Sequence, residues 1–337
     1  MLSPKKKASD SQSVTISFDD NLVLPVIFGE HDKNLKTIEQ ELGIVILPRG
    51  NFLKLIGNKT VVKLAKNVLE QLYNLARKSN NIGTGEIIGT INILKNKTTN
   101  HGATDIDDVN SFSISAGKKI IKPRSSKQLD YFELVKKKQM VFCCGPAGTG
   151  KTYLAVAFAV SMLKTGQIDK IILSRPAVEA GERLGFLPGD LKEKIDPYLR
   201  PIYDALNDML SFSEVLKKIE SGTIEIAPLA FMRGRTLSNA FIILDESQNT
   251  TPIQMKMFLT RLGEDSKMII NGDLSQVDLP SGTKSGLRES ITILKDVKDI
   301  GFINFTDQDV VRNPLVSKIV SKYEEFEKTE GVGKRYF

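Results

Sequence analysis

The chain has 337 residues, 41% of them hydrophobic and 26% charged, which is enough for two domains with packed cores. Its net charge of +7 permits a polyanionic partner without demonstrating one. With only two histidines, His31 and His101, the sequence excludes histidine-rich zinc sites and nucleases that hold their metal through several histidines.

Two further features of the sequence indicate the cellular compartment of the protein. No run approaches the roughly 20 apolar residues of a membrane span. The two cysteines, Cys143 and Cys144, are adjacent in an apolar run and have no other partner, so we interpret them as buried small side chains. We therefore expect a reduced, cytoplasmic protein without a membrane anchor.

The N-terminal part is predicted to be a disordered tail followed by a small α/β domain. Residues 1–17 are polar and rich in Lys and Ser, which favours disorder. Residues 18–80 carry the periodic apolar pattern of a folded domain. The predicted elements are a strand at 22–28, a helix at 32–43, strands at 44–47 and 52–57, and a helix at 60–78.

Residues 81–118 are rich in Gly, Asn, Thr and Ser and are interpreted as a linker, with room for a short strand at 84–94. From 119 to 337, short apolar runs alternate with amphipathic helical patterns. The runs lie at 140–145, 170–175, 223–228, 241–246, 267–272 and 302–306. This alternation is typical of an α/β domain with a mostly parallel sheet covered on both faces.

Residues 145–152 match the phosphate-binding loop G-x-x-x-x-G-K-[ST] at every fixed position, between a predicted strand and a helix. Backbone N–H groups of such a loop and the helix N-terminus bind phosphate oxygens. We expect Lys151 to bridge the β- and γ-phosphates of ATP, and the Thr152 hydroxyl to coordinate Mg²⁺. The residues expected to contact ATP are Gly145, Pro146, Ala147, Gly148, Thr149, Gly150, Lys151 and Thr152.

The apolar run at 241–244 ends in Asp245 and Glu246, the Walker B pattern. Asp245 is predicted to hold Mg²⁺, and Glu246 to act as the general base that aligns the attacking water. The run at 267–272 ends in polar residues that continue to Gln276. We expect this strand end to face the γ-phosphate; an ordinary Asn-Gly turn is the alternative.

Two further contacts are predicted with alternatives left open. A cation at the transition state is expected from Arg312, ahead of Arg288, Arg233 and Arg235; any of these could instead be structural. Gln128, seventeen residues before Gly145, is a candidate for reading the adenine edge, with a surface glutamine as the equal alternative.

Several longer stretches resemble the PhoH-like family of the bacterial housekeeping type. They are 174–206, 228–249, 271–280 and 310–317, with 145–155 in agreement. The resemblance implies a RecA-like ATPase domain, similar to the core of superfamily 1 helicases, and a link to RNA metabolism, often beside a YbeY-type endoribonuclease. By analogy with such enzymes, Arg175 and Glu179 become candidates for a nucleic-acid or coupling loop.

The N-terminal domain resembles a KH-like module in its helix–strand–strand–helix order. A KH loop clamps the nucleic-acid backbone with G-x-x-G. In this chain the equivalent residues 29–32, Gly-Glu-His-Asp, keep only the first glycine and add two acids. RNA binding and protein docking therefore both remain open for this domain.

The motifs predict an ATPase, and the resemblance implies that it is coupled to RNA, as either a helicase or a remodeller. The alternative is an ATP-dependent conformational switch or adaptor without motor activity. Because about two hundred residues supply only one RecA-like lobe, we expect a homo-oligomeric ring in which an arginine such as Arg312 acts on the neighbouring subunit's site. A small-molecule kinase is disfavoured, because the Asp-Glu pair suits water activation.

Overall fold

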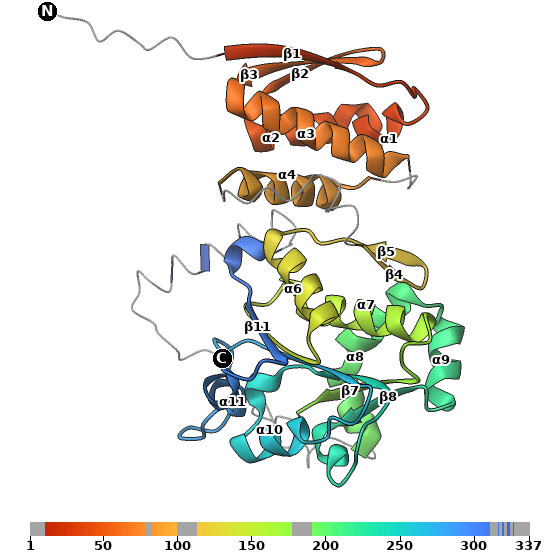
Figure 1. The fold of residues 1–337 in the computed structure, drawn as a ribbon, viewed down its shortest axis with the longest axis vertical. Helices are drawn as coiled ribbons and strands as arrows, with labels where there is room; N and C mark the ends of the chain where they lie inside the picture. Colours follow the sequence, from red (N-terminus) through yellow and green to blue (C-terminus); the bar gives the residue numbers. More distant parts are fainter. Residues whose placement is uncertain are drawn as a thin grey trace, which may run out of the picture. The chain divides into compact units, whose positions relative to one another are not determined.

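The computed structural model describes residues 11–77, 82–99, 113–176 and 191–310, together with residues 316, 319, 322, 323 and 326. The described chain forms two compact units (Figure 1). The first unit comprises the residues up to 99 and residues 122–129. The second comprises residues 113–121 and the chain from residue 130 onward.

The first unit has a three-stranded antiparallel sheet of order β1–β3–β2; α2 and α3 pack against the sheet, and α4 packs against these two helices (Figure 1). Its elements are β1 (Ser11–Ser17), α1 (Leu24–Phe28), the 3-10 turn η1 (Glu30–Asp32), α2 (Lys33–Leu42), β2 (Val45–Arg49), β3 (Phe52–Asn58), α3 (Lys59–Ala76) and α4 (Thr84–Thr99). The order α2–β2–β3–α3 confirms the KH-like prediction. The Asn58 side chain accepts a hydrogen bond from the Thr60 N–H at the start of α3, which stabilises this helix end.

Three predictions for this region were wrong. Residues 22–28 contain helix α1 rather than a strand; Pro25 lies in its first turn, where the missing N–H costs nothing. Residues 11–17, predicted as part of a disordered tail, form β1. Their composition is polar, but Val14 and Ile16 alternate with hydroxyl and amide residues and pack inward on the core.

The third correction concerns the predicted linker. Residues 84–99 form helix α4, and no strand forms at 84–94. Ile87, Ile91 and Leu94 follow helical spacing and are buried in the core of the first unit. The second unit begins at residue 113 with a hairpin, so the segment between the predicted domains is partly folded into each of them.

The second unit is built on a six-stranded parallel sheet of order β11–β6–β10–β9–β7–β8. Its elements are β4 (Ile114–Ala116), β5 (Lys119–Ile121), α6 (Ser126–Lys137, whose first residues belong to the first unit), β6 (Met140–Cys144), α7 (Lys151–Lys164), β7 (Lys170–Arg175), α8 (Leu191–Met209), α9 (Phe212–Glu220), β8 (Ile224–Pro228), η3 (Leu229–Met232), β9 (Ala240–Leu244), η4 (Ser247–Asn249), α10 (Pro252–Leu259), β10 (Lys267–Gly272), α11 (Gly286–Leu294), β11 (Ile300–Asn304) and η5 (Asp307–Asp309). The predicted RecA-like α/β fold is confirmed.

Helices cover both faces of this sheet, so its central strands are buried throughout. On one face, Phe142 and Ile270 belong to a core that includes Phe258 of α10. On the other face, the Phe158 ring of α7 meets Phe132 of α6 at 5.0 Å between ring centroids. Both cysteines of β6 are buried, and burial raises the pKa of Cys144 to about 11, in keeping with a packing role.

Parallel pairing places the carboxyl ends of all six strands at one edge of the sheet. The 145–152 loop follows β6, and Arg175 ends β7. Asp245 follows β9, and Asp273 follows β10. In open parallel sheets this edge is where ligands bind, because the loops that leave it can surround a bound molecule. Among the described residues, no helix combines the length and apolar character needed to cross a membrane.

Candidate functional site

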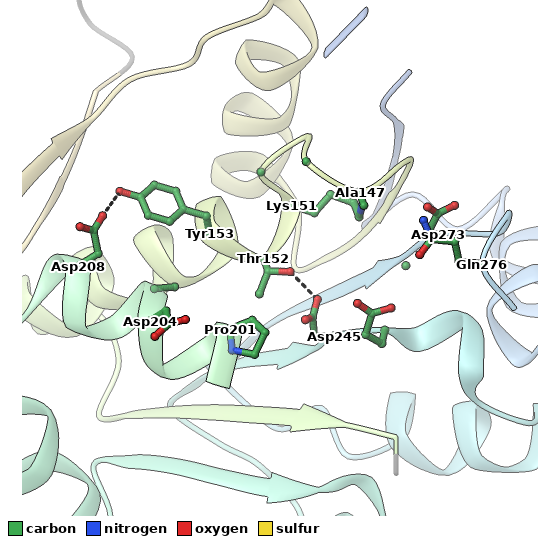
Figure 2. Close-up of a pocket in the computed structure, with 15 residues that line it drawn as sticks. Ala147, Lys151, Thr152, Tyr153, Pro201, Asp204, Asp208, Asp245, Asp273 and Gln276 are labelled. Atoms are coloured by element: carbon green, nitrogen blue, oxygen red, sulfur yellow. Dashed lines mark hydrogen bonds between the residues drawn. The ribbon is translucent and has the colours of Figure 1, made fainter. Parts of the chain in front are cut away.

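A cavity of about 650 Å³ lies at the carboxyl edge of the sheet in the second unit (Figure 2). The 145–152 loop and the start of α7 form one wall, and α8 forms another. The ends of β9 and β10 close the floor and the far side. The sequence-predicted residues that line it are Ala147, Gly148, Gly150, Lys151, Thr152, Asp245, Glu246 and Gln276.

Glycine is required at two points of the loop. Gly145 has a φ of +143°, and a Cβ there would lie 2.6 Å from the Cβ of Phe305, which is too close for any side chain. Gly150, at φ +83°, is the N-cap of α7 and supplies no side-chain cap. The N–H groups of the first turn therefore have no N-cap side chain to donate to, and the helix N-terminus carries positive potential.

Lys151 lies back across the loop. Its Nζ donates to the carbonyl oxygen of Gly145 at 2.6 Å and to that of Pro146 at 2.9 Å. The same Pro146 carbonyl accepts a hydrogen bond from the Thr149 hydroxyl at 2.9 Å. Gly145, Pro146 and Thr149 thus shape the loop and hold the ammonium group, while Lys151 itself lines the cavity.

Thr152 and Asp245, predicted as partners in metal binding, are in direct contact. The Thr152 hydroxyl donates to Asp245 Oδ1 at 2.7 Å (Figure 2). Asp245 is only 4% exposed, and burial raises its pKa above the ordinary value. The hydrogen bond from Thr152 and the charges of Arg175 and Lys151 oppose that rise. The two predicted oxygen ligands are therefore adjacent, with positive charge nearby.

Glu246 is held on both of its carboxylate oxygens. Its backbone is left-handed, with a φ of +52°, which turns the chain sharply after β9. Oε1 lies 3.5 Å from Nη2 of Arg175, and Oε2 accepts a hydrogen bond from Nε2 of Gln248 at 2.6 Å. The Gln248 oxygen in turn accepts the backbone N–H of Asp273 at 2.9 Å. This chain of contacts joins the ends of β7, β9 and β10.

The end of β10 presents the predicted polar group. Asn271 is fully buried, and its side-chain atoms make no hydrogen bond within the described chain, which is unusual for a buried amide. Asp273 and Gln276 line the cavity (Figure 2). A Cβ on Gly272 would lie 2.3 Å from Leu287 and 2.8 Å from the Ser247 hydroxyl, so this turn packs against α11 and the segment after β9.

The α8 wall was not predicted from sequence. Pro201, Asp204, Ala205 and Asp208 line the cavity from this helix, opposite Tyr153 of α7. Asp208 accepts a hydrogen bond from the Tyr153 hydroxyl at 2.8 Å (Figure 2). It accepts a second hydrogen bond from Lys119. Its partial burial acts to raise the pKa, but these two hydrogen bonds outweigh it and lower the pKa. Tertiary contact alone assembles this wall, so no local pattern could have indicated it.

Gln248 was also missed, although it lies two residues beyond the predicted base and is 1% exposed. A polar residue within a few positions of the end of a Walker B strand is the signal that could have found it.

The remaining candidates have varied outcomes. Arg312 and Glu179 lie outside the described residues. Arg235 forms a bidentate ion pair with Glu225 of β8, and neither it nor Arg233 nor Arg288 lines the cavity. Gln128 is 3% exposed, and its Oε1 accepts the backbone N–H of Arg124 at 2.7 Å, so it is not a surface glutamine. Its contact with adenine stays a prediction.

Comparison with known proteins identifies relatives over most of the chain. Residues 120–324 match the family model described as PhoH-like protein. A PhoH-like protein of Bacillus subtilis (strain 168) is 50% identical over 298 residues, which cover 88% of this chain and 93% of the relative. A PhoH-like protein of Synechocystis is 44% identical over 302 residues, 89% of this chain and 91% of the relative.

A further relative shares less of the chain. Protein PhoH of Escherichia coli (strain K12) is 46% identical over 202 residues, 59% of this chain and 57% of its own. The matches of 298 and 302 residues are longer than the family segment 120–324 and must extend into the N-terminal part. The combination of both units is therefore shared with the Bacillus and Synechocystis relatives.

Proposed function

The chain belongs to the PhoH-like protein family, and on that premise we propose that it binds ATP with Mg²⁺ in the cavity of the second unit and hydrolyses it. The observation that carries the proposal is the contact between Thr152 and Asp245, 2.7 Å apart beneath a complete phosphate-binding loop. Ninety-three residues separate the two along the chain, and the fold brings the predicted metal ligands together.

The residues present fit a nucleotide phosphate and a magnesium ion. The glycines keep Cβ atoms away from the loop, and the start of α7 has no side-chain cap that would compete with an anion. The Thr152 hydroxyl and the Asp245 carboxylate are hard oxygen ligands of the kind Mg²⁺ prefers. When bound, Mg²⁺ neutralises phosphate charge and polarises the terminal phosphoryl group.

In this proposal the side chains of the cavity have different roles in hydrolysis. Lys151 leaves the carbonyls of Gly145 and Pro146 and contacts the phosphates, where a full negative charge is a stronger partner than a carbonyl oxygen. Glu246 accepts the proton of the attacking water. Gln248 and Arg175 orient the Glu246 carboxylate through the contacts to its two oxygens.

We further propose that hydrolysis is coupled to RNA, as a helicase or remodeller. The net charge of +7 supports a polyanionic partner. The second unit holds a single six-stranded RecA-like sheet, which supports completion of the site by a neighbouring copy in a ring. The roles of Arg312 in that contact and of a YbeY-type endoribonuclease as partner stay predictions.

One observation favours a second candidate function, an ATP-dependent conformational switch or adaptor. Both oxygens of Glu246 are engaged, and through Gln248 they are connected to the turn after β10. A base held in this way suits slow turnover, in which ATP binding rearranges the contacts and changes the surface that the protein presents.

The two candidates are separated by the rate of phosphate release with and without single-stranded RNA. The RNA-coupled function predicts at least a tenfold stimulation by RNA, which Lys151→Ala abolishes. A slow rate that RNA does not change would favour the switch and remove the RNA-coupled function. Thermal melting of each variant confirms that lost activity does not reflect lost folding.

A further inference from the structure

The sheet of the first unit has one face covered by helices and one face exposed (Figure 1). Along the central strand β3, Leu53 and Leu55 are fully buried against the helices. Phe52 and Lys54 alternate with them and point to the other face, where both are exposed. Phe52 is the first residue of this central strand, beside the turn at 50–51, and it is 50% exposed, which makes it a large aromatic side chain left open to solvent.

Strand register sets the neighbours of these two side chains. Phe52 is paired with Arg49 of β2 on one side and with Ser17 of β1 on the other. Lys54 is paired with Leu47 of β2, which is 44% exposed. An exposed aromatic ring therefore lies beside an arginine, with a lysine two residues further along the same strand.

The rest of the face is apolar on β2 and rich in hydroxyls on β1. Ile56 of β3 is paired with Val45, which is 48% exposed. The outward residues of β1 are Ser13, Thr15 and Ser17. No Asp or Glu occurs among the outward-facing residues of the three strands, so the face carries two positive charges and no negative one.

The loop where a KH module clamps nucleic acid has the opposite character. It carries Glu30 and Asp32 in this chain. A Cβ on Gly29 would lie 2.8 Å from the Asn34 side chain, and Asn34 is buried and donates to the carbonyl oxygens of Val26 and Ile82. The loop is therefore acidic, and the Asn34 side chain occupies the space beside Gly29. Both features disfavour the binding of a polyanion at this loop.

We propose that the open face of the β1–β3–β2 sheet binds single-stranded RNA. The proposal rests on the RNA-coupled function above and names the surface through which RNA is held. A base stacks on the Phe52 ring, and Arg49 and Lys54 contact phosphates. The hydroxyls of β1 both donate and accept hydrogen bonds, as does the ribose 2′-hydroxyl that distinguishes RNA from DNA.

A protein partner would also fit an exposed apolar face, but charge and aromatic placement favour RNA. A hydrophobic docking site needs apolar contact area, which a leucine at residue 52 would preserve, whereas stacking needs the aromatic ring. The variants Phe52→Leu and Phe52→Tyr therefore separate the two occupants, because only the tyrosine retains a ring.

The test measures binding of a fluorescent single-stranded RNA by anisotropy, with the full-length protein, without nucleotide, across a range of salt concentrations. Phe52→Leu should weaken binding roughly tenfold, and Phe52→Tyr should restore it. The double variant Arg49→Ser with Lys54→Ser should reduce the slope of log affinity against log salt by about 1.4, or about 0.7 for each lost phosphate contact. A DNA strand of the same sequence should bind more weakly than the RNA.

A matched control removes two exposed lysines from the helical layer. Lys36→Ser with Lys63→Ser lowers the net charge by the same amount and should leave the slope within experimental error. RNA binding that is unchanged in every variant of the sheet face, or that falls equally in the control, would overturn the proposal. Because binding is measured without ATP, loss of the proposed hydrolysis would not affect this result.

Discussion

At the residue scale, the cavity is organised around pairs of side chains that the chain brings together from distant positions. Thr152 contacts Asp245, and Glu246 contacts both Arg175 and Gln248. The local motifs could be predicted from sequence, because each depends on a short fixed spacing and on the strand next to it. The contacts of Gln248 and Asp208 could not be predicted, because they depend on which strands and helices become neighbours in the fold.

The Thr152–Asp245 pair leads to a prediction for Asp245→Asn. The amide keeps the shape and the hydrogen bond from Thr152 but removes the negative charge that favours a metal ion. The Mg²⁺ concentration needed for half-maximal hydrolysis should rise at least tenfold, while thermal stability changes little. The measurement is a titration of the hydrolysis rate with Mg²⁺, beside Asp208→Asn as a carboxylate of the same cavity that does not contact Thr152. An equal rise in both variants would contradict the assignment.

At the element scale, apolar runs predicted the strands of the parallel sheet well and those of the first unit less well. Buried central strands have apolar residues on both faces, so the run itself identifies them. Residues 22–28 form as strong an apolar run, yet a short run cannot distinguish a buried helix from a strand. α4 was missed because Gly, Asn and Thr interrupt a segment in which Ile87, Ile91 and Leu94 mark the buried side.

The helical assignment of α4 can be tested with Ile91→Ala. Ile91 is fully buried, so the substitution should destabilise the first unit by about 2–5 kcal/mol. Faster amide hydrogen exchange in peptides from β3 and α3 would report the loss. Leu22→Ala, at a side chain that is 88% exposed, should change exchange little. If residues 81–118 were only a linker, the two variants would behave alike.

The ion pair between β8 and the segment after η3 leads to a prediction about acid stability. The hydrogen bonds from Arg235 lower the pKa of Glu225 below its ordinary value of 4.5, against a smaller effect of burial. Because the folded-state pKa is lowered, the stabilisation is present above about pH 4.5 and is lost as the pH falls through the folded-state value. Both side chains are about a third exposed, so its size should be about 1 kcal/mol or less.

Urea unfolding of the unmodified protein and of Glu225→Gln, each measured from pH 7 to pH 3, checks this expectation. The difference in unfolding free energy should be present at neutral pH and shrink towards pH 3. A difference that stays constant over this range would show that the carboxylate charge has no part in it.

At the scale of the whole molecule, the chain joins a KH-like unit to a RecA-like unit, and relatives from Bacillus and Synechocystis match it over about nine-tenths of its length. The fold class followed from the alternation of strand and helix patterns along the chain. The boundary between the two units could not be predicted from the sequence. Residues 113–121 belong to the second unit and residues 122–129 to the first, and tertiary contacts rather than composition decide this division.

A single RecA-like sheet per chain leads to a prediction about assembly. With ATP and single-stranded RNA present, we expect the Glu246→Gln variant to sediment as a ring-sized homo-oligomer, because slow hydrolysis preserves the ATP-bound state. Sedimentation velocity measures this directly, and Lys151→Ala under the same conditions is the control that should not assemble in response to ATP. A monomer in every condition would rule out completion of the site by a neighbouring copy.

The central claim is that the cavity binds ATP with Mg²⁺ and that Glu246 activates the water. Calorimetric binding of ATP and phosphate release should be measured for the unmodified protein, Lys151→Ala and Glu246→Gln. We expect Lys151→Ala to lose binding, and Glu246→Gln to bind ATP within a few-fold of normal while phosphate release falls about 100-fold or more. Phosphate release by Glu246→Gln at the normal rate would contradict the account.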